Sequence, residues 1–299
     1  MEPKVELAKT RDFGEIIADS FLFIRQNLKP LVSCFFLFCG FFLLISAVFG
    51  MMQQLRLTEM INSMDSSDGG ATAVTRGFGR KTFLETSVMI IAMLLTYTAM
   101  PVTILSFMTL YKDKGNVAPT NEEVWGYFKY YFFKVLGGSI VNAIVLICGF
   151  ILCLIPGIYF YPVLGLIFPI MIVEHTTYGY AFNQSFRLIK DKWWTVFGAL
   201  FITWLIVAVC SSIITMPFAA VNIWSTFLQH TRHVHLSVLS IVSATILGQL
   251  AHVLYILPLV ALTLCYFSLT ESKHATGLMD RIDQIGLDNT DTDTPAEEY

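Results

Sequence analysis

The stretch LIPGIYFYPVLGLIFPIMIVEHTTYGYAFNQSFRLIKDKWW, residues 154–194, decides how this chain must fold. It opens on Pro156 and Gly157, continues as an apolar run to Val173, and ends in a segment of regularly spaced basic residues. The whole apolar run, residues 135–173, would be about 58 Å long as one helix, which exceeds the ~30 Å hydrocarbon core of a bilayer. Proline disfavours a continuous helix and glycine accepts unusual backbone angles. We therefore expect a tight turn at Pro156 and Gly157 between two spanning helices.

The composition indicates an integral membrane protein. Of the 299 residues, 55% are hydrophobic and 14% are charged, whereas a soluble domain carries roughly 25% charged residues. The net charge of -3 argues against nucleic acid as a partner. Six apolar segments are candidates for spanning helices. They cover residues 31–52, 84–110, 135–154, 157–173, 195–218 and 236–269.

The last apolar segment is too long for a simple span, because its residues would form a helix of about 51 Å. We expect it to project beyond the membrane with a kink at Pro258, and a break near Gly248 is the alternative. Residues 1–274 then form a single membrane domain. Residues 275–299 form a tail whose acidic, polar end is predicted to be disordered.

Three further segments have the helical period of an amphipathic surface helix, with one apolar face and flanking basic residues. They are residues 12–29, 122–134 and 176–192. The first and third align with one another, with Ser20 opposite Ser185 and Phe21 opposite Phe186. The fold class that follows is an all-α membrane protein of six spans. One surface helix followed by two spans is a candidate repeating unit.

The orientation follows from the basic residues, which favour the cytoplasmic side. If both termini lie inside, five of the 19 Lys and Arg residues fall in outer segments and the remaining fourteen fall in inner segments. We therefore expect a bacterial inner-membrane protein with both termini in the cytoplasm.

Residues 156–194, together with the N-terminal RDFGEIIADSFLFIRQNLKPL at 11–31, resemble a known family. It is the membrane domain attached to some glycerophosphoryl diester phosphodiesterases, which also has stand-alone six-helix relatives. The matching residues are Pro156, Gly157, Pro169, Glu174, Ala181, Ser185, Arg187, Lys190 and Trp194. Relatives commonly carry a basic residue within the fourth helix, and residues 161–165 have none. The resemblance does not imply phosphodiesterase activity, because that chemistry belongs to a soluble barrel of ~250 residues for which this chain has no room.

The candidate lipid contacts are basic and aromatic residues of the surface helices. They are Arg25, Lys29, Arg187, Lys190, Lys192, Trp193 and Trp194. Simple topology and anchoring is the alternative role for this set. Glu174 and His175 end the fourth span, where we expect an ion pair with Arg187 or Lys190 of the following helix, and contact with a lipid headgroup is the alternative.

Four polar residues form a candidate intramembrane cluster, namely Asn142, Thr245, Gln249 and His252. Polar side chains at membrane depth line solute paths in some proteins, but interhelical hydrogen bonding is the alternative that we favour. Outside the spans, His230, His233 and His235 lie close together in an outer loop, but no carboxylate or cysteine completes a metal site there.

No Walker A loop, GxSxG or HExxH motif is present. We therefore expect a non-enzymatic protein without a cofactor or bound metal, acting as a scaffold or lipid-interacting component of a membrane assembly. Its expected partners are membrane lipids and other membrane proteins. The alternative is a transporter or channel subunit with a polar path along the last helix.

Overall fold

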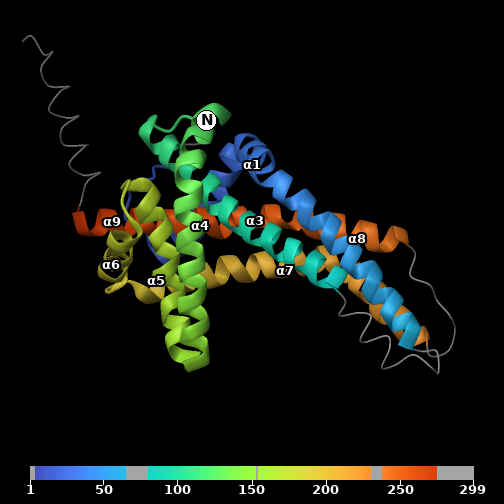
Figure 1. Cartoon of the computed structure of the whole chain (residues 1–299). Coiled ribbons are helices and arrows are strands. Elements are labelled where there is room, and N and C mark those ends of the chain that lie inside the picture. Colours follow the sequence, from blue (N-terminus) through green and yellow to red (C-terminus); the bar gives the residue numbers. More distant parts are fainter. Residues whose placement is uncertain (1–3, 65–79, 153, 230–237, 275–299) are drawn as a thin grey trace, which may run out of the picture.

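The computed structural model describes residues 4–64, 80–152, 154–229 and 238–274. Helices dominate these residues, and no strand occurs among them (Figure 1). The elements are α1 (Phe13–Met64), α3 (Arg80–Asp113), α4 (Asn121–Leu152), α5 (Leu154–Val173), α6 (Tyr178–Ile189), α7 (Trp193–Gln229), α8 (Val238–Leu250), the 3-10 turn η1 (Ala251–Tyr255) and α9 (Ile256–His274).

Six helical stretches of the described chain are long and apolar enough to cross a membrane. They are Phe13–Arg56, Thr82–Asp113, Asn121–Ile151, Ile155–Val173, Trp193–Pro217 and Val242–Lys273. This confirms the number and order of the predicted apolar helices, although most of the helices extend beyond the predicted bounds. The outer loop with its three histidines and the tail 275–299 lie outside the described residues.

The core lies in the second half of α3 and in α9. Residues 98–109 and 260–269 are buried on every side, which is unusual for a membrane helix because one face normally meets lipid. The buried threonine hydroxyls of α3 are satisfied within the helix; Thr103, for example, donates to the carbonyl of Ala99 at 2.8 Å, whereas the buried hydroxyl of Ser106 has no partner among the described residues. Backbone and hydroxyl groups inside a bilayer have no water to bond, so this internal pairing is what permits their burial.

The first helix bends near Asn27, whose φ of -117° and ψ of 21° are not helical. Pro30 explains the bend, because its ring clashes with the carbonyl four residues earlier in a straight helix. The amide of Asn27 donates to the carbonyl of Phe23 at 3.1 Å, which satisfies one backbone acceptor beside the bend. The bend falls inside the predicted surface segment 12–29, just before the predicted first span.

The other two predicted surface helices have different outcomes. Segment 122–134 is not a separate element, because α4 runs without a break from Asn121 to Leu152. Segment 176–192 is a separate helix, α6, with tighter bounds at Tyr178–Ile189. A threefold repeat of one surface helix and two spans is therefore not seen in these elements.

The turn predicted at Pro156 and Gly157 is not located at these two residues. Both belong to the first turn of α5, which begins at Leu154, and α4 ends at Leu152. Proline is tolerated there because the first N–H groups of a helix have no intrahelical partner. Glycine at position 157 is explained by close packing and not by an unusual backbone angle. A Cβ atom added to it would lie 2.6 Å from the ring of Phe150.

The last apolar segment is divided between α8, η1 and α9, with the 3-10 turn at residues 251–255. The break thus lies between the two predicted positions, three residues beyond Gly248 and three before Pro258. Pro258 sits in the first turn of α9, so it favours the start of that helix rather than a kink within it.

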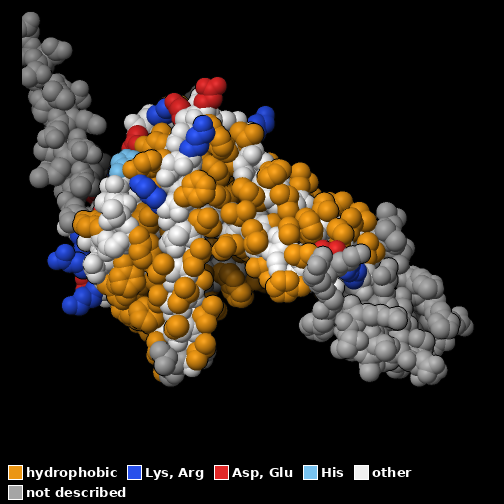
Figure 2. Space-filling view, viewed as in Figure 1, with side chains coloured by type: hydrophobic (Ala, Val, Ile, Leu, Met, Phe, Trp, Pro, Cys, Tyr) orange, Lys and Arg blue, Asp and Glu red, His pale blue; other side chains and the backbone are white. Residues whose placement is uncertain are grey.

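The α4–α5 hairpin diverges from α1, α3, α7 and α9, so that its tip stands apart from the other helices (Figure 1). Apolar side chains cover most of the visible face, whereas charged side chains gather at the end where the N-terminus lies (Figure 2). Ile151 and Ile155 beside the tip are 78% and 76% exposed. This apolar, projecting tip is suited to a lipid environment.

Candidate membrane-surface site

The chain reverses direction at the end of α5. His175 adopts the left-handed conformation with φ of 53°, and the N–H of Thr176 donates to the carbonyl of Met171 at 3.2 Å. This is the hydrogen bond of a Schellman motif, which ends a helix and turns the following chain back. As a result, α6 returns alongside α5.

The packing of α6 follows from its amphipathic sequence. Its buried residues are Ala181, Ser185, Leu188 and Ile189. Near its start the hydroxyl of Tyr178 donates to the side-chain oxygen of Asn142 in α4 at 2.7 Å. Near its end the ring of Phe186 lies edge-on to that of Phe160 in α5, with centroids 6.1 Å apart. Therefore α6 covers α5 from its end back to its first turns.

The start of α7 contacts the same part of α5. The indole N–H of Trp193 donates to the carbonyl of Tyr159 at 3.2 Å, and the two rings stack with centroids 5.8 Å apart. Trp193 also stacks on Phe197 at 4.9 Å. The neighbouring Trp194 is 77% exposed. The predicted aromatic pair is thus divided into one anchored ring and one exposed ring.

The predicted basic residues remain accessible in the structure. Arg187 and Lys190 are exposed and Lys192 is half-buried. Lys273, near the end of α9, lies 3.7 Å from the carboxylate of Asp191 and donates to the carbonyl of Arg187. The cations of this segment are therefore gathered where α6, α7 and α9 meet. We call Arg187, Lys190 and Lys192 the basic segment.

Arg25 and Lys29 lie on α1, on either side of its bend, and both are exposed. They come from a different helix than the basic segment. The predicted basic lipid contacts therefore fall into two separate groups in place of one continuous set.

Glu174 and His175 do not form the expected ion pair with Arg187 or Lys190 among the described side chains. Instead the hydroxyl of Tyr266 donates to the carboxylate of Glu174 at 2.9 Å. The hydroxyl of Tyr131 lies 2.5 Å from Nδ1 of His175. Because α6 turns back along α5, its basic end lies away from Glu174. Tyrosines of α4 and α9 supply the partners in its place.

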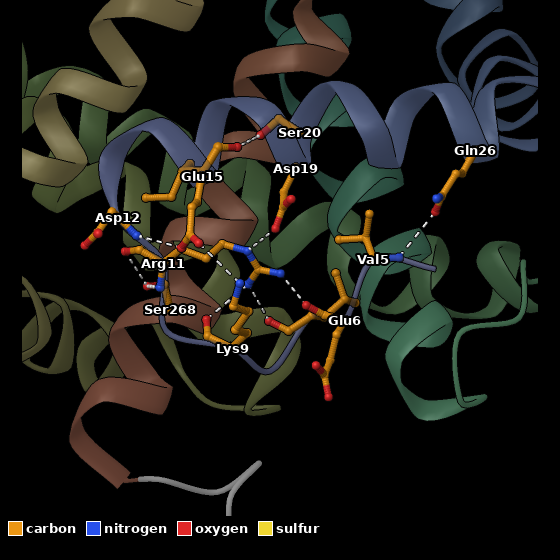
Figure 3. A network of polar contacts seen from close by, with 12 residues as sticks. Val5, Glu6, Lys9, Arg11, Asp12, Glu15, Asp19, Ser20, Gln26 and Ser268 are labelled. Atoms are coloured by element: carbon orange, nitrogen blue, oxygen red, sulfur yellow. Dashed lines mark hydrogen bonds and ion pairs between the residues drawn. The ribbon is translucent and has the colours of Figure 1, made fainter. Parts of the chain in front are cut away.

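Sequence reasoning missed a buried arginine at the same end of the molecule. Arg11 is one of the fourteen basic residues assigned to inner segments, but its side chain has no exposed area and its Nε donates to Asp19 at 2.7 Å. Figure 3 shows the guanidinium enclosed by the N-terminal segment, where it donates to the carbonyls of Leu7, Lys9 and Glu6.

The backbone of Arg11 also joins the N-terminal segment to α9. Its N–H donates to the hydroxyl of Ser268 at 2.9 Å, and that hydroxyl lies 3.3 Å from its carbonyl oxygen. The arginine therefore folds the N-terminal segment and fixes it to the core. No spacing rule in the sequence indicates these contacts, since most of them are to backbone carbonyls.

The four predicted intramembrane polar residues are not brought together. Asn142 donates to the carbonyl of Leu164 at 3.2 Å and accepts from Tyr178, so it joins α4, α5 and α6. Gln249 accepts from Ser46 of α1 at 3.3 Å. His252 lies in η1, where Nδ1 is 3.1 Å from the carbonyl of Gly248. Thr245 lies on α8. The hydrogen bonds of Asn142 and Gln249 are interhelical, as expected for packing.

The described residues contain no cluster of His, Cys, Asp and Glu suited to a metal ion. The chain was also compared with known proteins, and no family model, curated protein or solved structure matches it. What the fold defines is a class: a multi-pass, all-α membrane protein with basic and aromatic residues gathered at the end of the bundle that carries the N-terminal segment.

Proposed function

We propose that this chain is a non-enzymatic protein of a bacterial inner membrane that contacts lipid as a scaffold component. In this proposal both termini are cytoplasmic, and the α4–α5 hairpin lies obliquely within the cytoplasmic leaflet. The proposal is supported above all by the contact between Tyr159 and Trp193, since it fixes how α5 lies relative to the charged residues.

The contacts at the two ends of α5 support the oblique arrangement. Tyr159 contacts Trp193, which directly follows the basic segment, and fifteen residues later Glu174 contacts Tyr266. Fifteen residues of helix are about 22 Å long. If α5 stood along the membrane normal, these two charged neighbourhoods would be about 22 Å apart in depth, so at least one of them would lie inside a ~30 Å hydrocarbon core.

Such a placement is costly. A Lys, Arg or Asp at the centre of a spanning helix costs about 2.5–3.5 kcal/mol on the insertion scale. Arg187, Lys190, Asp191 and Lys192 would each incur part of this cost, because their long or charged side chains would lie below the interface. An α5 helix that lies obliquely keeps both charged ends at the same surface and avoids this cost. Four helical stretches then remain as full spans, in α1, α3, α7 and α8–α9.

The oblique hairpin also accounts for its own sequence. Residues 143–158 carry no polar side chain, although they include the connection between α4 and α5. A connection that emerged into water would be expected to carry polar residues. In the proposed arrangement this apolar tip lies among lipid chains, and the basic segment lies at the level of the headgroups.

The basic segment then attracts anionic lipid, with about 1 kcal/mol for each Lys or Arg near the surface. The resemblance to a membrane domain without catalytic motifs is compatible with this role. A lipid-contacting scaffold also agrees with the hydrogen bonds of Asn142 and Gln249, which join helices to one another.

The test is retention of anionic lipid by protein in nanodiscs of mixed phosphatidylglycerol and phosphatidylcholine, read by mass spectrometry. The variant Arg187→Gln, Lys190→Gln, Lys192→Gln is expected to lose about fivefold in apparent affinity per charge. The control Lys4→Gln, Lys9→Gln, Lys114→Gln removes the same number of charges near the same end. Two of those lysines already pair with Glu15 and Glu123, so a smaller loss is expected. Equal retention by the first variant and the parent would refute the proposal.

A further inference from the structure

A cavity of about 250 Å³ lies beneath α5, between this helix, α3, α7 and the junction of η1 with α9. Its lining is rich in aromatic rings, which include Tyr97, Tyr161, Phe168, Trp204 and Tyr255. Tyr97 and Trp204 are each more than 40% exposed, so the cavity meets the surface of the helices. Because these residues lie within apolar helices, that surface faces lipid.

The local sequence creates this space. Gly165 contributes no side chain, and a Cβ atom added there would only touch Leu262 at 3.4 Å. Across the cavity the helix is interrupted by η1, which ends at Tyr255, and Pro258 also belongs to the lining. Irregular backbone at membrane depth is tolerated where it is buried in protein or lines a cavity. A break in the last span at this level is consistent with a binding site.

The tyrosine hydroxyl groups are the informative feature. Tyr97, Tyr161 and Tyr255 line the cavity, and their hydroxyls make no side-chain hydrogen bond to the described part of the chain. A hydroxyl without a hydrogen bond in an apolar medium costs about 1–3 kcal/mol by protein mutational data. Tyrosines at such positions usually find a partner.

The rings around these hydroxyls form a compact group. The centroids of Tyr97 and Tyr255 are 6.3 Å apart, and His252 lies 6.1 Å from the first and 6.0 Å from the second. Flat aromatic faces of this kind favour a flat ligand that can stack against them. Hydroxyl donors at their edges favour a ligand that carries carbonyl acceptors.

We propose that this cavity binds a membrane-soluble molecule with a flat ring bearing carbonyl oxygens, of the quinone class. An apolar cavity of about 150 Å³ holds benzene, so the larger space here accommodates a substituted ring. One or two tyrosine hydroxyls donate to the ring carbonyls, and the alkyl tail leaves through the lipid-facing opening. This binding requires none of the basic segment and is independent of the headgroup contact proposed above.

The experiment uses a decyl-substituted benzoquinone titrated into the full-length protein in nanodiscs, with tryptophan fluorescence as the readout. The parent is expected to show saturable quenching, and Trp204→Phe is expected to lose its saturable part while the other four tryptophans of the sequence remain. Quenching that never saturates, or that is unchanged in Trp204→Phe, would overturn the proposal because it would report partition into the bilayer.

Further variants test how the cavity recognises the quinone ring. Gly165→Ile fills the cavity and is expected to abolish saturable quenching, whereas Gly137→Ile, at an exposed glycine of α4 with open space around it, is expected to retain it. Replacing Tyr97, Tyr161 and Tyr255 by Phe is expected to weaken binding by about two- to tenfold per lost hydrogen bond. Thermal melting of each variant establishes that it is folded, and Gly165→Ala replaces Gly165→Ile if the latter is not.

The same titration distinguishes a carbonyl-bearing ring from other molecules that could occupy the cavity. Decylbenzene has the ring and tail without the carbonyls, and it is expected to compete weakly. Equal competition by decylbenzene, or equal affinity of the triple Phe variant, would overturn the assignment of a carbonyl ligand. Displacement of the quinone by brominated phospholipid at low molar ratio would also overturn it, since the occupant would then be a lipid chain.

Discussion

The indole N–H of Trp193 donates a hydrogen bond to the backbone carbonyl of Tyr159, and the two rings stack. These residues are 34 positions apart, at the start of α7 and in the second turn of α5. The contact means that α7 does not begin beside the end of α5 but beside its start. It follows that the charged residues between α6 and α7 lie at the level of the early turns of α5.

The position of the hairpin tip yields the first prediction. In a protein whose six cysteines are replaced, Ile155→Cys is expected to resist a membrane-impermeant maleimide from both sides, because the proposed arrangement places the tip in lipid. A lipid-soluble maleimide should still react with it. Val117→Cys, in the exposed connection before α4, serves as the control and should react from the cytoplasmic side. Reaction of Ile155→Cys from the outer side alone would show that α4 and α5 cross the membrane.

Close packing within the hairpin yields the second prediction. A Cβ atom at Gly157 would lie 2.6 Å from the ring of Phe150, so Gly157→Ala is expected to lower the free energy of unfolding by ~1–3 kcal/mol. Combining it with Phe150→Ala should recover part of that loss. Gly137→Ala, where nothing lies within 4 Å, is the matched control and should be neutral.

Pro156 is expected to behave differently from its neighbour. Because it occupies the first turn of α5, Pro156→Ala should change the unfolding free energy by less than about 1 kcal/mol. The free energy of unfolding of all four variants is measured in mixed micelles. A larger effect of Pro156→Ala than of Gly157→Ala would contradict the packing explanation and favour a turn that depends on proline.

The Asn142 bridge yields the third prediction. This side chain joins α4 to the carbonyl of Leu164 and to the hydroxyl of Tyr178. Interhelical hydrogen bonds in membranes contribute about 0.6 kcal/mol on average and up to about 1.7. We expect Asn142→Leu to cost roughly 1–2 kcal/mol and Tyr178→Phe to cost less. A double-mutant cycle measures their coupling, and strict additivity would mean that the bond does not contribute to stability.

The buried arginine yields the fourth prediction. Arg11→Met removes the partner of three backbone carbonyls and of Asp19, and we expect a loss of about 2–4 kcal/mol in unfolding free energy. Arg11→Lys should rescue little, because one ammonium group cannot reach the same set of acceptors. Lys9→Gln is the control, since the exposed pair of Lys9 with Glu15 contributes at most about 1 kcal/mol.

Limited proteolysis gives a second measurement for the same variant. Loss of the Arg11 side chain removes the hydrogen bonds that hold the carbonyls of Glu6, Leu7 and Lys9, so residues 4–12 should become easier to cleave. If Arg11→Met melts like the parent and its N-terminal segment stays protected, the guanidinium network does not anchor that segment.

The sequence by itself determined the class of fold. In lipid, the backbone N–H and C=O groups of an apolar segment of spanning length can be hydrogen-bonded within that segment only if it is a helix. The six helices and their order along the chain therefore follow from composition and spacing. The amphipathic period of residues 176–192 likewise predicted α6, because one apolar face at the helical period must be buried. The split of the last segment between Gly248 and Pro258 was also indicated by these residues.

Only the tertiary structure decided how the helices are arranged. Every helix in a membrane must be apolar, so apolarity does not distinguish a helix that crosses the bilayer from the oblique arrangement proposed for α5. The burial of Arg11 and the gathering of Tyr97, Tyr161 and Tyr255 around one cavity depend on contacts between distant segments. Such arrangements leave no periodic pattern in the sequence. The side chain of Arg11 bonds to backbone carbonyls, and the tyrosines come from three separate helical segments that line the cavity.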